Sequence, residues 1–372
     1  MKVLICLYQD SQKSGGSFRV AEVAVEAMLS LGMDVHVAVA YGEGGRIKQI
    51  LGARCHLIGA GSKSDFWGWR RYRSLMRALE PDITHYVDAV GWMILAATGL
   101  HRRRIMHQHL RPNVRLVTKG GGARLLPRIL FAGADRIVSI SHGAAREMRA
   151  LYKISEERVT VIHNAVNLSR FRFSLKNSGS ARRLGMAIRI VEYKGVEDAI
   201  HLLAMLPDQF ILAVAGQGPA MGELKIVAER LNVSHRIEWM GDVEDITQFY
   251  EGIDYYLFMS WYEGFGLSVA EAMASGRPVV GLLGDGEISE PEYPLVTGEN
   301  SLLIRRPHGE LASSSNIDIL HELCDAILKI DLDRCRKEDM VNTARLWIEQ
   351  KFSAQEYARK LCTLYDSVHA GA

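Results

Sequence analysis

Residues 255–283 read YYLFMSWYEGFGLSVAEAMASGRPVVGLL, and this stretch contains one complete repeating unit of an α/β sheet. Tyr255–Met259 is an apolar run of strand length, and Val279–Leu283 is another. Between them, a glycine-bearing turn leads into a short helical segment that Gly276 and Pro278 end. The order strand, turn, helix, strand predicts two parallel strands joined by a crossover helix.

Two glutamates mark this stretch, with Glu263 in the predicted turn and Glu271 about two turns into the predicted helix. A turn before a helix directs free backbone N–H groups and the positive end of the helix dipole towards a bound anion. Carboxylates beside such a pocket accept hydrogen bonds from vicinal hydroxyl groups. An anion together with a polyol suggests a nucleotide-sugar. The plain alternative is a solvated helix face, since glutamates at this spacing also occur by chance.

The composition is typical of a soluble globular protein with two domains. The chain has 372 residues, of which 48% are hydrophobic and 24% charged, and its formal net charge is +2. No apolar run approaches the ~20 residues that a membrane span requires, and Met1–Tyr8 is expected to be a first strand rather than a signal peptide. The five cysteines are scattered without metal-ligand spacing, so we expect a reduced, cytoplasmic compartment.

Apolar runs of strand length alternate with amphipathic helical segments, which predicts an α/β fold with parallel sheets. Residues 171–184, polar and rich in serine and basic residues, are the expected linker between two Rossmann-like, doubly wound domains. We expect an N-terminal acceptor-side domain at 1–170, a C-terminal nucleotide-sugar-binding domain at 185–352 and a closing helix at 353–372. The expected strands are Val3–Leu7, Val35–Ala40, Ile83–Val87, Arg104–His107, Arg136–Ile140, Ala187–Val191, Phe210–Ala215, Arg236–Trp239, Tyr255–Met259 and Val279–Leu283.

Ligands of doubly wound sheets bind outside the carboxyl ends of the strands, so the loops there should carry the chemistry. After the first strand, Gly15 and Gly16 precede a helical segment and would let the backbone approach an anion or a substrate closely. In the second half, Arg189 and Lys194 follow a strand, and their charges suit a diphosphate. Cations fixed there would stabilise the charge that a leaving nucleoside diphosphate gains. The alternatives are a tight turn for the glycines and a solvated surface pair for the cations.

A third loop, Ala215–Gly222, supports a competing hypothesis. Gly216 and Gly218 follow a strand, and Glu238 comes about twenty residues later, as in a dinucleotide-binding fingerprint. The third glycine of the loop is one position late, however, and Pro219 removes a backbone donor from the turn. A dinucleotide-dependent dehydrogenase is therefore the less favoured interpretation.

Six blocks, in order along nearly the whole chain, resemble the retaining glycosyltransferases of family four (GT4), which have the GT-B architecture of two Rossmann-like domains facing a cleft. One such block would be a weak signal, whereas six in the family order are a specific one. The blocks are Gly15–Gly16, Ala134–Ser141, Val159–Asn167, Arg189–Lys194, Ala215–Pro219 and Trp261–Pro278.

The resemblance implies a role for each matching position. Arg189 and Lys194 would hold the donor diphosphate and take part in catalysis. Glu263 would bind the transferred sugar and also take part in catalysis, and Glu271 would bind the ribose hydroxyls. The other expected donor-binding positions are Gly15, Gly16, Gly216, Gly218 and the backbone of Gly264, Phe265 and Gly266.

The family also places a histidine near the donor sugar, after a central strand of the first domain. The matching segment, Met106–Leu110, contains two candidates for a catalytic histidine, and we prefer His109 to His107 because it lies further into the loop. The alternative is a histidine that only forms structural hydrogen bonds. Some turns depart from the family pattern, which touches turn geometry more than charge and leaves the donor open. These departures are His163–Asn167, Ile188 and Met259–Ser260.

The resemblance implies that the sugar keeps its anomeric configuration and that no metal is bound. No Asp-x-Asp triplet or histidine cluster offers a divalent site beside the phosphates, and Arg189 and Lys194 would supply the positive charge instead. With no clear carboxylate nucleophile, we expect attack by the acceptor hydroxyl on the same face, with the departing phosphate oxygen accepting its proton. No resident cofactor is expected, and the donor substrate is a UDP-, GDP- or ADP-sugar.

The segment from residue 63 to residue 128 is strongly basic, with 13 basic and 4 acidic residues, and aromatic residues interleave with the charges. A basic helix with exposed tryptophans suits an anionic membrane surface, where each cation contributes ~1 kcal/mol. The predicted membrane or acceptor patch consists of Trp67, Trp69, Arg70, Arg71, Arg73, Arg77, Arg102, Arg103 and Arg104.

This patch leads to the hypothesis of a cytoplasmic enzyme attached peripherally to the inner membrane, with a saccharide or lipid-linked acceptor from polysaccharide, lipopolysaccharide or glycolipid biosynthesis. The alternative is a soluble basic face with buried tryptophans. Nucleic acid is not an expected partner, because no recognition motif accompanies the charge. A sugar-nucleotide epimerase of the same architecture and a non-catalytic binding protein remain the other candidate classes.

Overall fold

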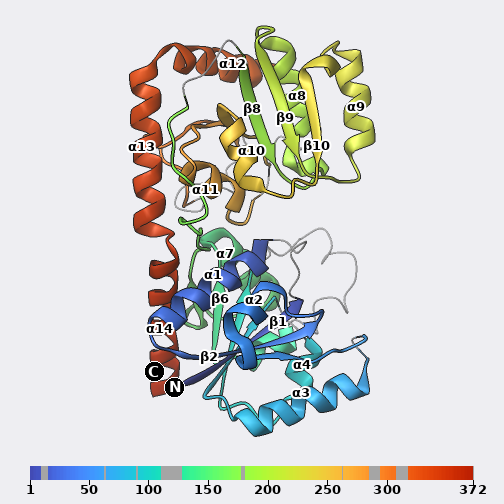
Figure 1. The fold of residues 1–372 in the computed structure, drawn as a ribbon, viewed down its shortest axis with the longest axis vertical. Helices are drawn as coiled ribbons and strands as arrows, with labels where there is room; N and C mark the ends of the chain where they lie inside the picture. Colours follow the sequence, from blue (N-terminus) through green and yellow to red (C-terminus); the bar gives the residue numbers. More distant parts are fainter. Residues whose placement is uncertain are drawn as a thin grey trace. The chain divides into compact units, whose positions relative to one another are not determined.

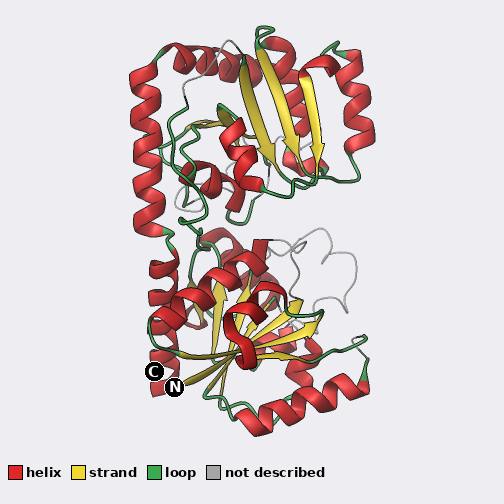
Figure 2. Cartoon of the chain, viewed as in Figure 1, coloured by secondary structure: helices red, strands yellow, loops and turns green. Residues whose placement is uncertain are grey.

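The computed structural model describes residues 1–9, 16–62, 64–88, 91–109, 128–176, 181–261, 263–284, 294–306 and 317–371. The chain forms two compact units. The N-terminal unit contains Met1–Ala165 together with Phe352–Ala372, and the C-terminal unit contains Val166–Lys351. Each unit has a parallel sheet with helices around it (Figures 1 and 2).

The N-terminal unit is built on a parallel sheet in the order β3-β2-β1-β4-β5-β6-β7. Its strands are β1 (Lys2–Gln9), β2 (Asp34–Tyr41), β3 (Cys55–Leu57), β4 (Ile83–Val87), β5 (Arg103–Gln108), β6 (Arg136–Ser139) and β7 (Val159–Val161). Its described helices are α1 (Gly16–Ser30), α2 (Gly45–Leu51), α3 (Phe66–Leu79), α4 (Gly91–Ala96), α7 (His142–Tyr152) and α14 (Ala354–Ala370), with 3-10 turns η1 (Gly52–Arg54) and η2 (Glu156–Arg158).

The C-terminal unit has a second parallel sheet, in the order β10-β9-β8-β11-β12-β13. Its strands are β8 (Arg182–Ala187), β9 (Phe210–Ala215), β10 (Ile237–Gly241), β11 (Tyr255–Phe258), β12 (Val279–Leu283) and β13 (Leu302–Arg305). Its described helices are α8 (Val196–Met205), α9 (Met221–Arg230), α10 (Ile246–Gly252), α11 (Leu267–Ala274), α12 (Ile317–Leu332) and α13 (Arg334–Lys351), with 3-10 turns η3 (Glu192–Lys194) and η4 (Ser234–Arg236).

The strand order of the C-terminal sheet shows where its winding reverses. In the C-terminal unit the chain runs outward from β8 to β10, then returns to the centre at β11 and runs outward in the other direction. The loops after β8 and β11 therefore meet at the point where the winding reverses, which is where doubly wound sheets bind ligands. β11 and β12 are buried along their whole length, as expected for central strands covered on both faces.

One predicted strand has other bounds in the structure, and several short strands were not predicted. The strand expected at Ala187–Val191 is β8, which begins at Arg182 and ends at Ala187. It therefore starts inside the expected linker 171–184. The short strands β3, β7 and β13 were not predicted, because three or four partly exposed residues leave no clear apolar pattern.

The last helix belongs to the N-terminal unit by its contacts. Residues 353–372 were expected to form a closing helix, and α14 occupies Ala354–Ala370 and packs against α1 (Figure 1). The phenol of Tyr365 lies 2.5 Å from Nδ1 of His85 on β4. The contact division also falls at Ala165, five residues before the expected domain boundary.

Candidate functional site

The loops after β8 and β11 bring together a predicted cation and a predicted carboxylate. Lys194 ends the 3-10 turn η3, and Glu263 lies in the turn between β11 and α11. The Lys194 Nζ forms an ion pair with Glu263 Oε2, and both side chains are mostly buried, at 15% and 17% exposed. Opposite charges that are partly withdrawn from water interact more strongly than exposed ones.

A glycine lets these two loops approach each other. Gly195 follows η3 with φ +68°, and a Cβ at this position would collide with the carbonyl oxygen of Met259 at the end of β11. The backbone N–H of Trp261 donates to the carbonyl oxygen of Tyr193 at 2.9 Å. The backbone therefore fixes the distance between the two loops independently of the Lys194–Glu263 pair.

The second glutamate is held inside the adjoining helix. Gly266, with φ +82°, precedes α11, so Glu271 lies in the second turn of that helix. Glu271 is 8% exposed, and its Oε2 accepts a hydrogen bond of 2.8 Å from the hydroxyl of Tyr250 in α10. Phe265 is buried at 2% exposed, so its backbone and not its side chain is available to a ligand at this turn.

The glycine loop after β9 packs against the segment that carries Arg189. The amides of Ile188 and Ile190 donate to the carbonyl oxygens of Ala215 and Gln217, both at 2.9 Å. A Cβ at Gly216 or Gly218 would collide with the carbonyl oxygen of Ile188 or Ile190, respectively. These glycines are thus required for backbone packing, and the packing places them beside Arg189, whose side chain is exposed.

In the N-terminal unit, the preferred histidine lies in a buried cluster of imidazoles. His109 follows β5 and is 8% exposed, and its backbone N–H donates to Asp88 Oδ1 at 2.8 Å. Its ring centroid lies 4.1 Å from that of His107, which stacks on His85 at 5.2 Å. Burial lowers the pKa of His109, although the neighbouring Asp88 opposes the shift. Gly16 begins α1, and Gly15 lies outside the described residues.

Burial also favours the neutral form of the other imidazoles in this cluster. It lowers the pKa of His85 to about 3 and that of His107 well below its usual value. His107 is 2% exposed within β5, whereas His109 lies beyond the strand. Of the two candidates, His109 is thus the one placed on a loop, as the sequence analysis preferred.

The basic patch is only partly exposed. Trp69 packs inward and stacks on Trp92, with ring centroids 6.3 Å apart and an interplanar angle of 19°. Side chains two residues apart on a helix are rotated by about 200° about its axis, so Trp67 and Trp69 point in nearly opposite directions. Trp67 is 65% exposed, and its neighbour Phe66 is 63% exposed. The expectation of two exposed tryptophans therefore does not hold for Trp69.

Several arginines of the patch are occupied by other partners. Arg71 donates to the carbonyl oxygens of Ile58 and Gly59, and Arg73 donates to those of Ala96 and Thr98. Arg102 pairs with Glu80 and Asp82, each at 3.1 Å, and Arg103 pairs with Asp135 at 3.2 Å. Arg104 is partly buried, and its backbone donates to Asp135. What remains is an exposed stripe on α3 formed by Phe66, Trp67, Arg70 and Arg77.

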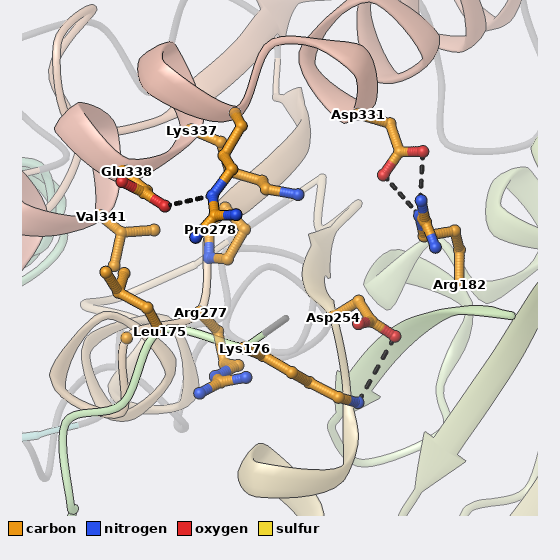
Figure 3. A pocket seen from close by; sticks show the side chains of 12 residues that line it. Leu175, Lys176, Arg182, Asp254, Arg277, Pro278, Asp331, Lys337, Glu338 and Val341 are labelled. Atoms are coloured by element: carbon orange, nitrogen blue, oxygen red, sulfur yellow. Dashed lines mark hydrogen bonds and ion pairs between the residues drawn. The ribbon is translucent and has the colours of Figure 1, made fainter. Parts of the chain in front are cut away.

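A polar cavity lies at the opposite edge of the C-terminal sheet, next to the amino ends of β8, β11 and β12 (Figure 3). Most of its charged side chains form ion pairs with one another. The pairs are Lys176 with Asp254, Arg182 with Asp331, and Arg334 with Glu338. The pair of Arg182 and Asp331 connects α12 to the start of β8, whereas the pair of Arg334 and Glu338 lies within α13.

Two structural features that would point to other chemistry are absent from the described residues. No helix there is long and apolar enough to cross a membrane. Nor does any group of three or more His, Cys, Asp and Glu side chains in that part of the chain have a geometry that could hold a metal ion.

The strand orders and the site at the reversal point of the C-terminal sheet define a two-domain α/β protein of the GT-B class. Residues 14–170 match the model of Glycosyltransferase Family 4, and residues 169–347 match that of Glycosyl transferases group 1. Together the two models cover nearly the whole chain. The chain therefore belongs to the family 4 glycosyltransferases.

Named relatives agree with this assignment. The chain is 24% identical over 246 residues to an uncharacterized glycosyltransferase of Methanocaldococcus jannaschii. This aligned region covers 62% of the chain and 59% of the relative. It is 28% identical over 274 residues to the lipopolysaccharide core biosynthesis mannosyltransferase LpsB of Rhizobium meliloti. Here the aligned region covers 66% of the chain and 74% of the relative. Seven of the curated relatives are matched over only about half of their own length, between 43% and 59%.

A solved structure shares the fold at low identity. The Anabaena protein HepE, in a crystal structure with UDP-glucose, superposes with a TM-score of 0.75 at 19% identity, covering 99% of this chain and 100% of that one. Similarity at this level of identity shows the fold alone.

Sequence reasoning missed three side chains around the site. Tyr250 contacts Glu271, and a buried pair of Asp198 and Arg306 lies behind the turn that carries Glu263. No spacing pattern connects these positions, which are far apart in the sequence and meet only through the sheet. An aromatic or charged residue just outside a predicted strand would have been the only available signal.

Proposed function

We propose that the protein transfers a sugar from a nucleotide-sugar donor to an acceptor hydroxyl. The observation that carries this proposal is the pairing of Lys194 with Glu263 at the reversal point of the C-terminal sheet, beside the start of α11. A cation for a diphosphate and a carboxylate for sugar hydroxyls thus lie within contact distance of each other. Glu271, in the same helix, supplies a second carboxylate for the ribose.

In this proposal, each charged group stabilises a different part of the donor. Lys194 and Arg189 hold the diphosphate and stabilise the negative charge that grows on it as the glycosidic bond breaks. Glu263 accepts hydrogen bonds from the transferred sugar and orients it. In the free protein Glu263 neutralises Lys194, which avoids leaving an unpaired charge in a mostly buried place.

We further propose that the reaction retains the anomeric configuration and needs no bound metal. The two cations supply positive charge at the position where a metal would otherwise act. The acceptor hydroxyl attacks the anomeric carbon on the face that the phosphate leaves, and the departing phosphate oxygen accepts its proton. From the N-terminal unit, Gly15 and Gly16 would contribute to donor binding and His109 would lie near the donor sugar.

UDP is the first nucleotide to test, because the Anabaena relative was crystallised with UDP and with UDP-glucose. Thermal unfolding should be measured without added metal in the presence of UDP, GDP, ADP, their glucose conjugates and NAD. A ligand at a hundred times its dissociation constant adds about 2.7 kcal/mol to the stability of the folded state. One nucleotide that raises the melting temperature supports the transferase. A shift with NAD alone would instead revive the dehydrogenase, and product analysis separates transfer from epimerisation.

The acceptor is proposed to be a saccharide or a lipid-linked saccharide at an anionic membrane surface. The relative LpsB acts in lipopolysaccharide core biosynthesis, and the stripe of Phe66, Trp67, Arg70 and Arg77 on α3 combines exposed aromatic rings with cations. Vesicles containing phosphatidylglycerol should pull down the wild type at low salt, and a Trp67→Ala and Arg70→Ala double variant should bind them less. Wild-type protein that stays in solution would remove the membrane from the proposal.

A further inference from the structure

A buried ion pair lies directly behind the candidate donor site. Arg306 follows β13, and Asp198 lies in the first turn of α8. The Arg306 Nη2 lies 2.7 Å from Asp198 Oδ2, and the two side chains are only 1% and 6% exposed. Withdrawing two charges from water this completely is unfavourable, and such a pair is often no better for stability than an apolar pair of the same shape. The pair therefore needs an explanation beyond stability.

The same two side chains hold the segment that leads from β11 to Glu263. The indole N–H of Trp261 donates to Asp198 Oδ2 at 3.1 Å. The Cζ atom of Arg306 lies 3.8 Å from the centroid of the Trp261 ring, a close cation–π contact. Arg306 also donates to the carbonyl oxygen of Met259 at 3.0 Å. Both ends of the short segment before the Glu263 turn are thus fixed by one guanidinium.

This segment is connected in turn to the loop that carries Lys194. The backbone N–H of Trp261 donates to the carbonyl oxygen of Tyr193, one residue before Lys194. The backbone N–H of Arg306 donates to Leu283 at the end of β12, at 3.0 Å. Through these contacts the ends of β8, β11, β12 and β13 form one connected network around the Lys194–Glu263 pair.

We propose that Arg306 and Asp198 are positioning residues, which hold Trp261 in place and thereby fix the Glu263 carboxylate opposite Lys194. Neither residue reaches a substrate itself. This inference rests on the proposed function, because it assigns Glu263 to the transferred sugar and the cations to the diphosphate. Loosening the turn should therefore weaken recognition of the sugar while leaving recognition of the diphosphate largely intact.

The first test compares two probes, UDP and UDP-glucose, by isothermal titration calorimetry. In the wild type and in Arg305→Met, which replaces the exposed neighbouring arginine, the ratio of the two dissociation constants should be the same. In Arg306→Met we expect UDP-glucose to bind at least tenfold more weakly relative to UDP. Arg306→Lys should lie between them, since lysine keeps the charge but lacks the planar fork. An unchanged ratio in Arg306→Met overturns the proposal.

A second test needs no ligand and includes a variant in which the ion pair stays intact. Trp261→Phe keeps Arg306 and Asp198 paired but removes the indole N–H. In both Trp261→Phe and Arg306→Met, amide hydrogen exchange should become at least tenfold faster in residues 191–195 and 259–264 and stay unchanged in β8 and β9. Faster exchange over the whole C-terminal unit would mark general destabilisation and overturn the positioning role, as would no change in the two loops.

The two tests also separate this inference from the proposed function. If the wild type binds neither UDP nor UDP-glucose, the donor assignment loses its support, while the exchange experiment still decides whether Arg306 orders the two loops. If the wild type binds both probes and exchange is unaffected by either variant, the transferase stands and the positioning role fails.

Discussion

The two sheets share the same order in their first six strands, yet the groups around their strand ends differ in charge. In the C-terminal unit, the loops after β8 and β11 carry Lys194 and Glu263 as an ion pair. In the N-terminal unit, β4 and β5 carry His85 and His107 and lead to His109, all of them buried. The C-terminal sheet thus carries a pair of opposite charges that is partly exposed to solvent, and the N-terminal sheet carries imidazoles that are buried and neutral.

The difference shows how one architecture supports two electrostatic environments near its strand ends. A charged ligand such as a diphosphate requires fixed charges that are compensated when the ligand is absent. Burial has another effect in the N-terminal unit, where it lowers the pKa of His85, His107 and His109 and so favours their neutral forms. Substitutions in both units should separate these two environments, with exposed residues of the C-terminal unit as controls.

Removing the cation of the C-terminal site should have the largest effect. Lys194→Ala is expected to lower kcat/KM by about 10²–10³, the range seen when one stabilising group is removed from a developing charge. It also leaves Glu263 unpaired, so the nucleotide affinity should fall as well. Initial rates with a nucleotide-sugar donor measure the effect, and Lys225→Ala, at an exposed lysine of α9, is the control. Unchanged turnover would remove Lys194 from the mechanism.

Neutralising the buried carboxylate of α11 should have a smaller effect. Glu271→Gln keeps the shape of the side chain but replaces hydrogen bonds to a charged acceptor, worth about 1.5–3 kcal/mol each, by bonds to a neutral one, worth about 0.5–1.5 kcal/mol. We expect a tenfold or greater rise in the dissociation constant for the nucleotide, measured by calorimetry. Glu223→Gln, at an exposed position in α9, should leave that affinity unchanged. Equal affinities in the two variants would contradict the ribose-binding role.

The histidines predict a pH dependence that arises in the N-terminal unit. Burial lowers the pKa of His85 to about 3 and that of His101 to about 4, from the usual 6.5. The folded state therefore binds fewer protons than the unfolded state below pH 6.5. The stability due to each group is fully present above pH 6.5 and is lost as the pH falls, by about 1.4 kcal/mol per pH unit.

Urea unfolding at pH 7.5 and pH 5.5 measures this loss. His85→Gln should reduce the difference between the two pH values, because it removes a group that the unfolded state protonates. His235→Gln, at an exposed histidine of the C-terminal unit, should retain the wild-type difference. A pH effect that His85→Gln does not alter would mean that other groups dominate.

The paired charges at the other edge of the C-terminal sheet should matter least. The pair of Arg334 and Glu338 is exposed, with 72% and 36% of the two side chains accessible. Arg334→Ala should change the free energy of unfolding by no more than about 0.5 kcal/mol and leave nucleotide affinity unchanged. A loss of affinity similar to that of Glu271→Gln would show that both edges of the sheet act on the donor.

Some largely buried strands could be predicted from the sequence because their apolar runs match the strands themselves. Phe210–Ala215 and Val279–Leu283 were predicted with their observed bounds. The boundary of β8 was misplaced because the apolar run continues past Ala187 to Val191, and nothing local shows where strand pairing stops. Short edge strands such as β13 are specified by pairing with β12 and not by their own pattern.

The site was predictable where a motif is contiguous, as in the turn with Glu263 and the helix with Glu271. Its supporting contacts were not, because Asp198 and Arg306 are separated by 108 residues and meet only through the sheet order. The inward position of Trp69, by contrast, follows from helix geometry alone, since residues two apart point in opposite directions.

The return of α14 to the N-terminal unit has a consequence for biosynthesis. Residues 1–165 lack part of their packing until Phe352–Ala372 has been made, because Tyr365 and Cys362 fill places beside His85 and Met33. A ribosome adding about 5–20 residues per second finishes the whole C-terminal unit before that helix emerges. The first half of the chain to be synthesised is therefore the last to reach its native packing.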